Sequence, residues 1–282
     1  MTTTSTTSNT STWPDARRTG GWLGLLLLDA LTEARASLRT PEFLALAITV
    51  PVLLYAMFGL PNAEETLPGG ATVGVAMMVS MAAYGVVTLA ITVFGEDVAK
   101  ERGRGWVRTL YATGFPPAVH LAGKAGAALV HATLVVVAVG LLAAFAGGVE
   151  LPPGRWLGFG AMLVSGVLVF SSLGFAIAYL ARPRTATTLV NVIFLPLSFA
   201  SGVFVPLSQL PGWVSQVASY LPTYHFGQLA YRTVMPDASV AAFTGSATAP
   251  VWVHVLWVAG SAVALVALAL LGARREAVTR RG

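Results

Sequence analysis

Six apolar stretches alternate with short polar or charged segments along the chain. They lie near residues 43–60, 71–94, 118–146, 157–181, 186–206 and 250–272. A bilayer core about 30 Å thick is crossed by roughly 20 residues of α-helix, so each stretch is long enough to span it. The pattern predicts an all-α membrane protein with six transmembrane helices, in a transmembrane domain covering 41–273.

An amphipathic segment, GWLGLLLLDALTEARASLR, precedes the first apolar stretch. Its leucines and alanines recur at helical spacing, opposite Asp29, Glu33, Arg35 and Arg39. Such a pattern is typical of a helix that lies in the membrane interface, which we place within 21–40. It serves either as an anchor for the first span or as a contact for a cytoplasmic partner.

The segment after the fifth apolar stretch contains PGWVSQVASYLP and then TYHFGQLAYRTV. Prolines at 211 and 222 punctuate it, and its apolar runs are too short to span a bilayer. We expect short re-entrant helices within 207–234 that dip into the outer leaflet. An ordinary interfacial cap is the alternative.

The two ends of the chain differ in composition from its middle. Residues 1–20 begin with a run of Thr and Ser that has neither the basic start nor the apolar run of a signal peptide, which predicts a disordered tail. Residues 274–282 are predicted to be a cytoplasmic tail.

Charge and hydropathy agree with membrane insertion. Only 10% of the 282 residues are charged and the mean hydropathy is +0.73, which excludes an ordinary soluble domain. Of the 17 Lys and Arg residues, all but Arg155 and Arg232 fall on one side of the predicted membrane. The positive-inside rule then places both termini in the cytoplasm of a bacterial cell and explains the basic pI without nucleic acid.

Candidate catalytic chemistry is sparse in this chain. It has no cysteine, and its four histidines lack metal-ligand spacing. No carboxylate falls in the middle of a predicted span; His131 alone lies deep, and we interpret it as a packing residue. Gly123-Lys124 lacks the rest of a Walker loop. We expect no catalytic residue, metal or cofactor here, so uphill transport would need energy from another polypeptide.

The charged stretch GEDVAKERGRGWVRTLYATGFPP, residues 95–117, stands between the second and third apolar stretches. Helical spacing predicts pairs between Lys100 and both Glu96 and Asp97, and between Glu101 and Arg104. Two glycines should interrupt this helix before a second short one, which GFPP ends. The candidate partner-docking residues are Glu96, Asp97, Lys100, Glu101, Arg104, Gly105, Trp106, Arg108, Leu110 and Tyr111. A solvated loop with positive-inside charges is the alternative.

Polar and small residues in the fifth stretch are candidates for lining a substrate pathway: Asn191, Pro196, Ser198, Ser201 and Gly202. Polar side chains at membrane depth bind solutes or hold helices together, and the sequence leaves both roles open.

The run EDVAKERGRGWVRTLYATGFPP through HLAGK, together with NVIFLPLSFASGVFVPLSQLPGWVSQVASYLPTYHFGQL, resembles the membrane subunit of type 2 ATP-binding-cassette exporters. The resemblance is to the bacterial drug and antibiotic export permeases and covers most of the chain. It implies a coupling helix at Glu96 to Tyr111 that docks on a cytoplasmic ATPase. It also implies an interfacial helix at 21–39 and re-entrant helices at 207–234.

The resulting hypothesis is a permease in the bacterial cell membrane that exports a small amphiphilic drug, antibiotic or lipid. We expect a homodimer in contact with membrane lipid and two ATPase subunits, which bind the ATP and Mg that this chain does not. A membrane enzyme or assembly factor without transport activity is the alternative, and an ion-coupled carrier is a weaker one.

Overall fold

The computed structural model describes residues 22–39, 41–106, 109, 112, 115, 117–246 and 249–279. Every regular element within these ranges is helical, which confirms the all-α fold class. The predicted tail at 1–20 lies outside them. The helices are α1 (Trp22–Leu38), α2 (Pro41–Leu54), η1 (Tyr55–Gly59), η2 (Leu60–Asn62), α3 (Val73–Ile91), η3 (Thr92–Asp97), α4 (Val98–Arg104), α6 (Pro117–Phe145), α7 (Pro153–Leu180), α8 (Pro183–Ala200), η4 (Leu207–Gln209), α9 (Gly212–Ala218), α10 (Pro222–Arg232), α11 (Asp237–Thr244) and α12 (Val251–Thr279).

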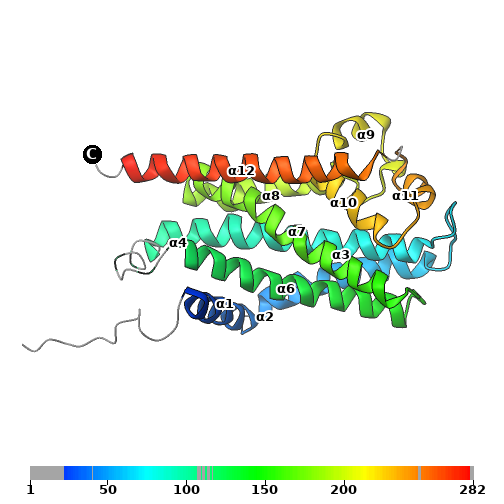
Figure 1. Cartoon of the computed structure of the whole chain (residues 1–282), viewed down its shortest axis with the longest axis horizontal. Coiled ribbons are helices and arrows are strands. Elements are labelled where there is room, and N and C mark those ends of the chain that lie inside the picture. The colour runs from blue at the N-terminus through cyan, green and yellow to red at the C-terminus, as the bar shows by residue number, and fades with distance from the viewer. Residues whose placement is uncertain are drawn as a thin grey trace, which may run out of the picture.

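The long helices lie side by side and form one elongated bundle (Figure 1). Four described segments are long and apolar enough to cross a membrane: Val73–Arg104, Val119–Phe145, Pro153–Leu180 and Val251–Gly272. They correspond to four of the six predicted spans. The predicted spans at 43–60 and 186–206 correspond to the shorter apolar helix Ala47–Asn62 and to α8, so the count of six stays a prediction.

The helix α3 forms the centre of this bundle. Of the 18-residue apolar stretch in the helical run that contains α3, 82% is buried inside the protein. The corresponding figure for α12 is only 17%, so α12 lies at the periphery. Small and unbranched side chains such as Ala76, Met78 and Ala82 are fully covered along α3. Because small residues let neighbouring backbones approach closely, they suit the most enclosed helix of a membrane bundle.

Prolines mark where several of the helices begin. Pro117, Pro153, Pro183 and Pro222 each occupy the first position of α6, α7, α8 or α10. Proline has no N–H to leave unsatisfied there, and its fixed φ suits the first helical turn. The local sequence therefore sets these boundaries, and α7 begins a few residues earlier than the apolar pattern alone predicts.

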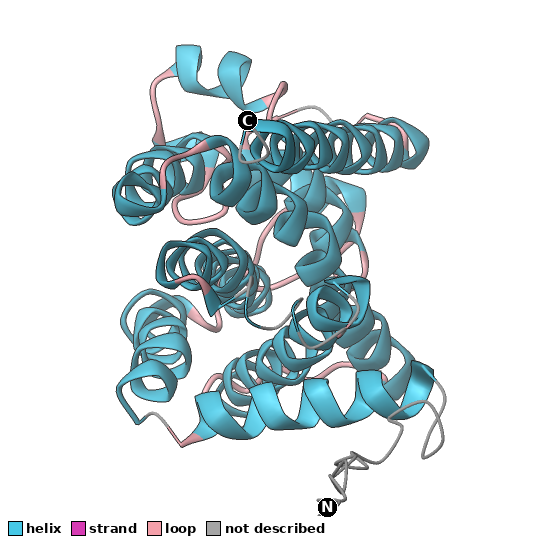
Figure 2. Cartoon of the chain, turned by 90° about the vertical axis from the view of Figure 1, so that its left-hand side faces the viewer, coloured by secondary structure: helices cyan, strands magenta, loops and turns pink. Residues whose placement is uncertain are grey.

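Helix α1 crosses the bundle instead of joining it. Figure 2 views the bundle from the end where α1 lies and shows this helix running across the axes of the others. It packs against α6 at Gly123 and Gly126, where an added Cβ would collide with the Asp29 carboxylate and with the Ala30 Cβ. The transverse course agrees with the predicted interfacial helix, and the two glycines allow its close approach.

The segment after α8 folds into short helices at the opposite end from α1 and α4 (Figure 1). Pro211 caps α9, and Pro222 separates α9 from α10. Sequence analysis predicts two such helices; the structure adds α11. The Tyr231 hydroxyl of α10 lies 2.6 Å from the Ser80 hydroxyl of α3, so α10 is tied to the central helix. Whether these helices are re-entrant in a membrane stays a prediction.

Changing Gly123 to Ala tests the crossing of α1 and α6. The new Cβ would displace Asp29, and overpacking of this kind typically costs about 1–3 kcal/mol. We expect a lower thermal unfolding midpoint for the purified protein. Gly160→Ala in α7 is the control, because nothing lies within 4 Å of its added Cβ. Ala is a better helix former than Gly, so this control should unfold at the same or a higher temperature. Equal behaviour of the two variants would contradict the close approach.

Candidate functional site

The charged stretch continues the central helix out of the bundle. Segments α3, η3 and α4 form one helical run of 32 residues, Val73–Arg104. At 1.5 Å per residue this is about 48 Å, longer than a bilayer core of about 30 Å. The run is therefore longer than a span requires, and α4 continues the central helix as the sequence predicts; its position outside the membrane stays a prediction.

The acids and bases of this stretch pair partly as predicted. The Lys100 ammonium lies 3.0 Å from the Glu96 carboxylate and 3.6 Å from the Asp97 carboxylate. Gly103 stays helical, so the prediction that it interrupts the helix is wrong. Gly105 ends α4 in the left-handed conformation, with φ of +75°. Glycine adopts that conformation without steric cost, so Gly105 permits the chain to leave α4 sharply.

Glu101 faces into the protein and pairs with α6. One of its carboxylate oxygens lies 2.7 Å from the Lys124 ammonium, and the other lies 3.3 Å from His120 Nε2. Lys124 also lies 3.3 Å from the Glu33 carboxylate of α1, and His120 Nδ1 lies 3.6 Å from that of Asp29. We call Asp29, Glu33, Glu101, His120 and Lys124 the inner network. It joins α1, α4 and α6.

The inner network is largely shielded from solvent. The Lys124 and His120 side chains are only 4% exposed. Burial raises the pKa of the Asp29 carboxyl above its usual range, and the neighbouring His120 opposes this rise. An ammonium buried this deeply is stable only when carboxylates surround it, because an unpaired buried charge is very costly. Glu33 and Glu101 supply those carboxylates.

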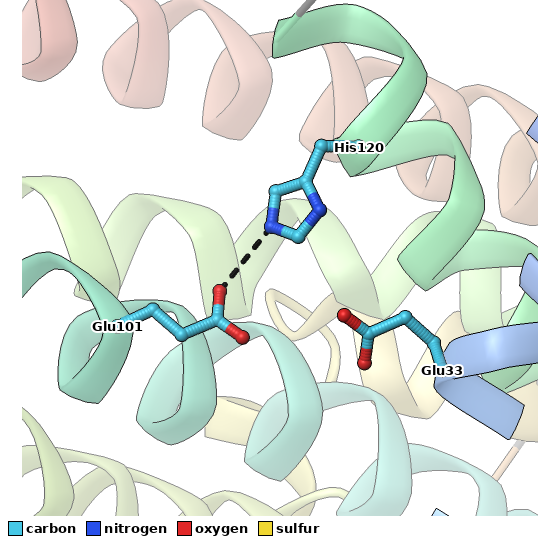
Figure 3. A group of neighbouring side chains, drawn as sticks. All are labelled: Glu33, Glu101 and His120. Carbon is cyan, nitrogen blue, oxygen red and sulfur yellow. Dashed lines mark hydrogen bonds and ion pairs between the residues drawn. The ribbon is translucent and has the colours of Figure 1, made fainter. Parts of the chain in front are cut away.

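Three members of the inner network also have the chemistry of a metal site. Figure 3 shows the Glu33 and Glu101 carboxylates and the His120 ring turned toward one shared space, and their candidate ligand atoms lie within 4.8 Å of one another. Lys124 contacts both of these carboxylates. A divalent cation would have to displace this buried ammonium from its partners. The arrangement therefore fits an ion-pair network better than a metal centre.

Helix α4 is fixed on its other sides as well. A guanidinium N–H of Arg102 donates to the Ala178 carbonyl near the end of α7, and the guanidinium lies 4.8 Å from the centre of the Tyr179 ring. Gly103 packs against Pro183 at the start of α8. A Cβ added at Gly103 would lie 3.0 Å from the Cβ of Pro183. α4 thus contacts α6, α7 and α8.

The predicted docking residues separate into two groups. Glu101 turns inward, whereas Lys100 and Arg104 are exposed and the Trp106 side chain beyond Gly105 is 51% exposed. Glu96 and Asp97 are partly covered and pair with Lys100. The predicted residues Arg108, Leu110 and Tyr111 lie outside the described part of the chain. Among the described residues, Lys100, Arg104 and Trp106 are thus the most accessible to a partner.

The predicted pathway residues do not share one exposed face. Asn191 is exposed and donates to the Thr187 carbonyl. Ser198 and Ser201 are buried, with hydroxyls bonded to carbonyls of their own helix. Pro196 lies inside α8, and Gly202 takes a left-handed φ of +72° just after it. Their role in a pathway stays a prediction.

A histidine pair joins α10 to α12. The Nδ1 atoms of His225 and His254 are 2.7 Å apart, and His225 Nε2 is 2.9 Å from the Ser219 carbonyl oxygen. The His225 ring also stacks on Trp257, with ring centres 5.1 Å apart. Sequence analysis missed this pair, because 29 residues separate its members and no spacing rule connects them. His131, in contrast, is a buried residue of α6, which fits its packing interpretation.

Sequence analysis also missed four members of the inner network. The sequence pattern indicates only a polar helix face for Asp29 and Glu33, and only one more basic residue at Lys124. The sequence does contain a signal, because three pairs of charged or ionisable residues each have a spacing of four. The pairs are Asp29 and Glu33 in α1, Asp97 and Glu101 in the charged stretch, and His120 and Lys124 in α6. Residues at this spacing share one helix face, so three short helix faces carried complementary charge.

Comparison with known proteins agrees with this architecture. The family model described as ABC-2 family transporter protein matches residues 61–271. The chain belongs to the ABC-2 transporter family. The match covers most of this ABC-2 chain, including α4, the buried bases of α6 and the short helices near α10.

A relative in Bacillus subtilis (strain 168) carries the name "Putative transport permease YvfS". It is 25% identical over 214 residues, which are 75% of this ABC-2 chain and 86% of the relative. Together with the family match and the long apolar helices, it identifies a multi-pass membrane protein of the transport type and confirms the family resemblance of the sequence.

Replacing Lys124 with Met tests the inner network. The substitution keeps a long side chain but removes the buried ammonium that the partly covered Glu33 and Glu101 carboxylates share, and breaking a buried pair typically costs about 3–5 kcal/mol. Lys100→Met is the matched control, since a pair this exposed contributes at most about 1 kcal/mol. We expect a much larger drop in thermal unfolding midpoint for Lys124→Met, partly recovered by adding Glu101→Gln. Equal drops in both single variants would show that the network is not structurally important.

Proposed function

We propose that this chain is the permease subunit of an exporter that moves a small amphiphilic drug, antibiotic or lipid out of the cell. A separate ATPase subunit, in two copies, binds Mg and ATP and supplies the energy. The ABC-2 family match and the permease name of the relative support a transport subunit with an ATP-hydrolysing partner. The apolar character of the bundle supports an amphiphilic substrate.

The observation that carries this proposal is the attachment of α4 to its neighbours. Trp106 is exposed just beyond Gly105, whereas Glu101 and Arg102, only a few residues earlier, are bound to α6 and α7. A force applied by an ATPase near Trp106 would therefore reach α6 and α7 through buried charges instead of being lost in a flexible loop. A merely solvated loop does not need these connections.

We place six spans in the membrane, with both termini in the cytoplasm. Segments α2, η1 and η2 are contiguous from Pro41 to Asn62, and α8 has 18 residues, so each is close to the roughly 20 residues that a bilayer requires. The amino end of α1, the end of α4 and the carboxyl end of α12 lie at one end of the bundle (Figure 1). Most of the described basic residues also belong to elements at that end, as the positive-inside rule requires of the cytoplasmic side.

We propose that two copies associate to form the substrate pathway between them. Helix α8 exposes Val192 and Leu195 together with the amide of Asn191, and a face of this composition suits an amphiphilic substrate. Two identical faces related by a two-fold axis would enclose a central pathway. Lipid would cover the outer surface of α12, whose apolar side chains are largely exposed.

Single cysteines test the topology, because the chain contains no natural cysteine. Cysteines at Glu64, Glu150 and Asp237 should react with a membrane-impermeant maleimide in intact cells. One at Gly103 should react only after the membrane is opened. Labelling at Gly103 from outside would invert the proposed orientation and remove the docking surface from the cytoplasm.

Replacing Trp106 with Ala tests the docking surface. An exposed anchor residue contributes to a partner interface and little to the fold of its own chain, and truncating such an anchor typically costs about 2 kcal/mol of binding. We expect loss of ATP-driven transport into inverted vesicles and loss of the co-purifying ATPase, identified by mass spectrometry, at unchanged permease abundance.

Trp213→Ala is the matched control for this experiment. Its side chain is 66% exposed on α9, at the opposite end of the bundle. It should retain both the ATPase and transport. If the Trp106→Ala protein transports normally with a full complement of ATPase, the docking proposal fails.

A further inference from the structure

A pocket opens at the end of the bundle opposite the inner network. Its volume is about 450 Å³, within the range of about 300–1,000 Å³ that is usual for small-molecule sites. It is lined by the ends of η1 and η2 with the loop that follows them, the first turns of α3, the chain after α8, and α11. Four separate parts of the sequence thus enclose one space.

Aromatic side chains form much of its wall. Phe58, Phe204 and Phe243 line the pocket, and Phe58 is 45% exposed. Phe204 also contacts Tyr84 of α3 and Phe199 of α8, with ring centres 5.2 and 4.8 Å apart. The faces of aromatic rings carry negative partial charge and attract cations, most strongly where water is partly excluded.

The described lining of the pocket carries negative charge and no positive charge. Glu65 is the one ionisable side chain among its described lining residues, beside the amides of Asn62 and Gln209. No described cation pairs with the Glu65 carboxylate, whereas Asp237, on the same side of the bundle, is paired with Arg232 at 2.9 Å. An unneutralised carboxylate beside aromatic rings favours a ligand that is apolar and positively charged.

We propose that this pocket binds an amphiphilic organic cation. The carboxylate of Glu65 would attract the charge, the rings of Phe58 and Phe204 would cover the apolar body, and anionic amphiphiles would be repelled. One part of the inference rests on the proposed function: if the pocket is the exit end of the transport pathway, the exported substrates are amphiphilic cations. Binding itself requires neither ATP nor the partner.

Two ions of matched shape and opposite charge provide the test. Tetraphenylphosphonium and tetraphenylborate would be titrated separately against the purified full-length protein in a neutral detergent, by calorimetry. We expect the cation to bind more tightly than the anion. Phe58→Ala should weaken binding of both ions, because it removes apolar wall and not charge.

Glu65→Gln should weaken cation binding by up to about fivefold, as expected for one charge interaction of an exposed carboxylate. Glu64→Gln is the matched control, since Glu64 is the adjacent carboxylate and does not line the pocket. Asn62→Asp should strengthen cation binding, because it adds a second carboxylate to the wall. This gain cannot be produced by a misfolded protein.

Equal affinity for the two ions, or cation binding that is unchanged in both Glu65→Gln and Asn62→Asp, would overturn the inference. Its failure is distinguishable from that of the proposed function. Cation binding that depends on Glu65 in a protein without ATP-driven transport would refute only the exporter. ATP-driven transport with cation binding independent of Glu65 would refute only the pocket.

Discussion

The end of the bundle that holds α1 and α4 depends on one buried ammonium. Lys124 lies between the carboxylates of Glu101 and Glu33, on two helices that are far apart in sequence. A buried ion pair adds little net stability compared with apolar packing, yet losing one partner is very costly. The pairing therefore contributes mainly to the specificity of helix packing. Arrangements in which α1 or α4 leaves α6 are disfavoured, because each would leave an unpaired charge in a poorly solvated site.

One continuous helical run connects the two ends of the molecule. Its first turns, at Val73 and Met77, line the pocket, and its last turns carry Glu101 and Arg102. Because α3 is enclosed by other helices, this run cannot shift without changing its neighbours. A single central element thus connects the proposed docking surface with the pocket.

Local patterns in the sequence were sufficient for much of the fold. Long apolar stretches predicted the long helices, and spacing predicted the contacts of Lys100 with Glu96 and Asp97. The partners of Glu101 required knowledge of which helices are neighbours, which a single sequence does not contain. Spacing predicted Arg104 as its partner, whereas the structure brings Glu101 to Lys124 and His120.

The candidate pathway shows the same limit. Ser198 is seven residues after Asn191 and shares its helix face by spacing, yet it is buried while Asn191 is exposed. The cause is the chain after α8, which folds back so that the Phe204 N–H donates to the Ser198 carbonyl. The π-helical turn η3 is a further feature that regular spacing does not reveal, since its extra residue per turn alters which side chains face the core.

The two histidine rings that join α10 to α12 limit the charge that this contact can hold. His225 Nε2 donates to the Ser219 carbonyl, so its Nδ1 accepts the proton that His254 Nδ1 carries. Only one proton fits between two nitrogen atoms 2.7 Å apart, so the closed contact is compatible with a neutral pair or a single imidazolium, but never with two. Full protonation of both rings would require α10 to separate from α12. This helix–helix contact is therefore sensitive to strong acid.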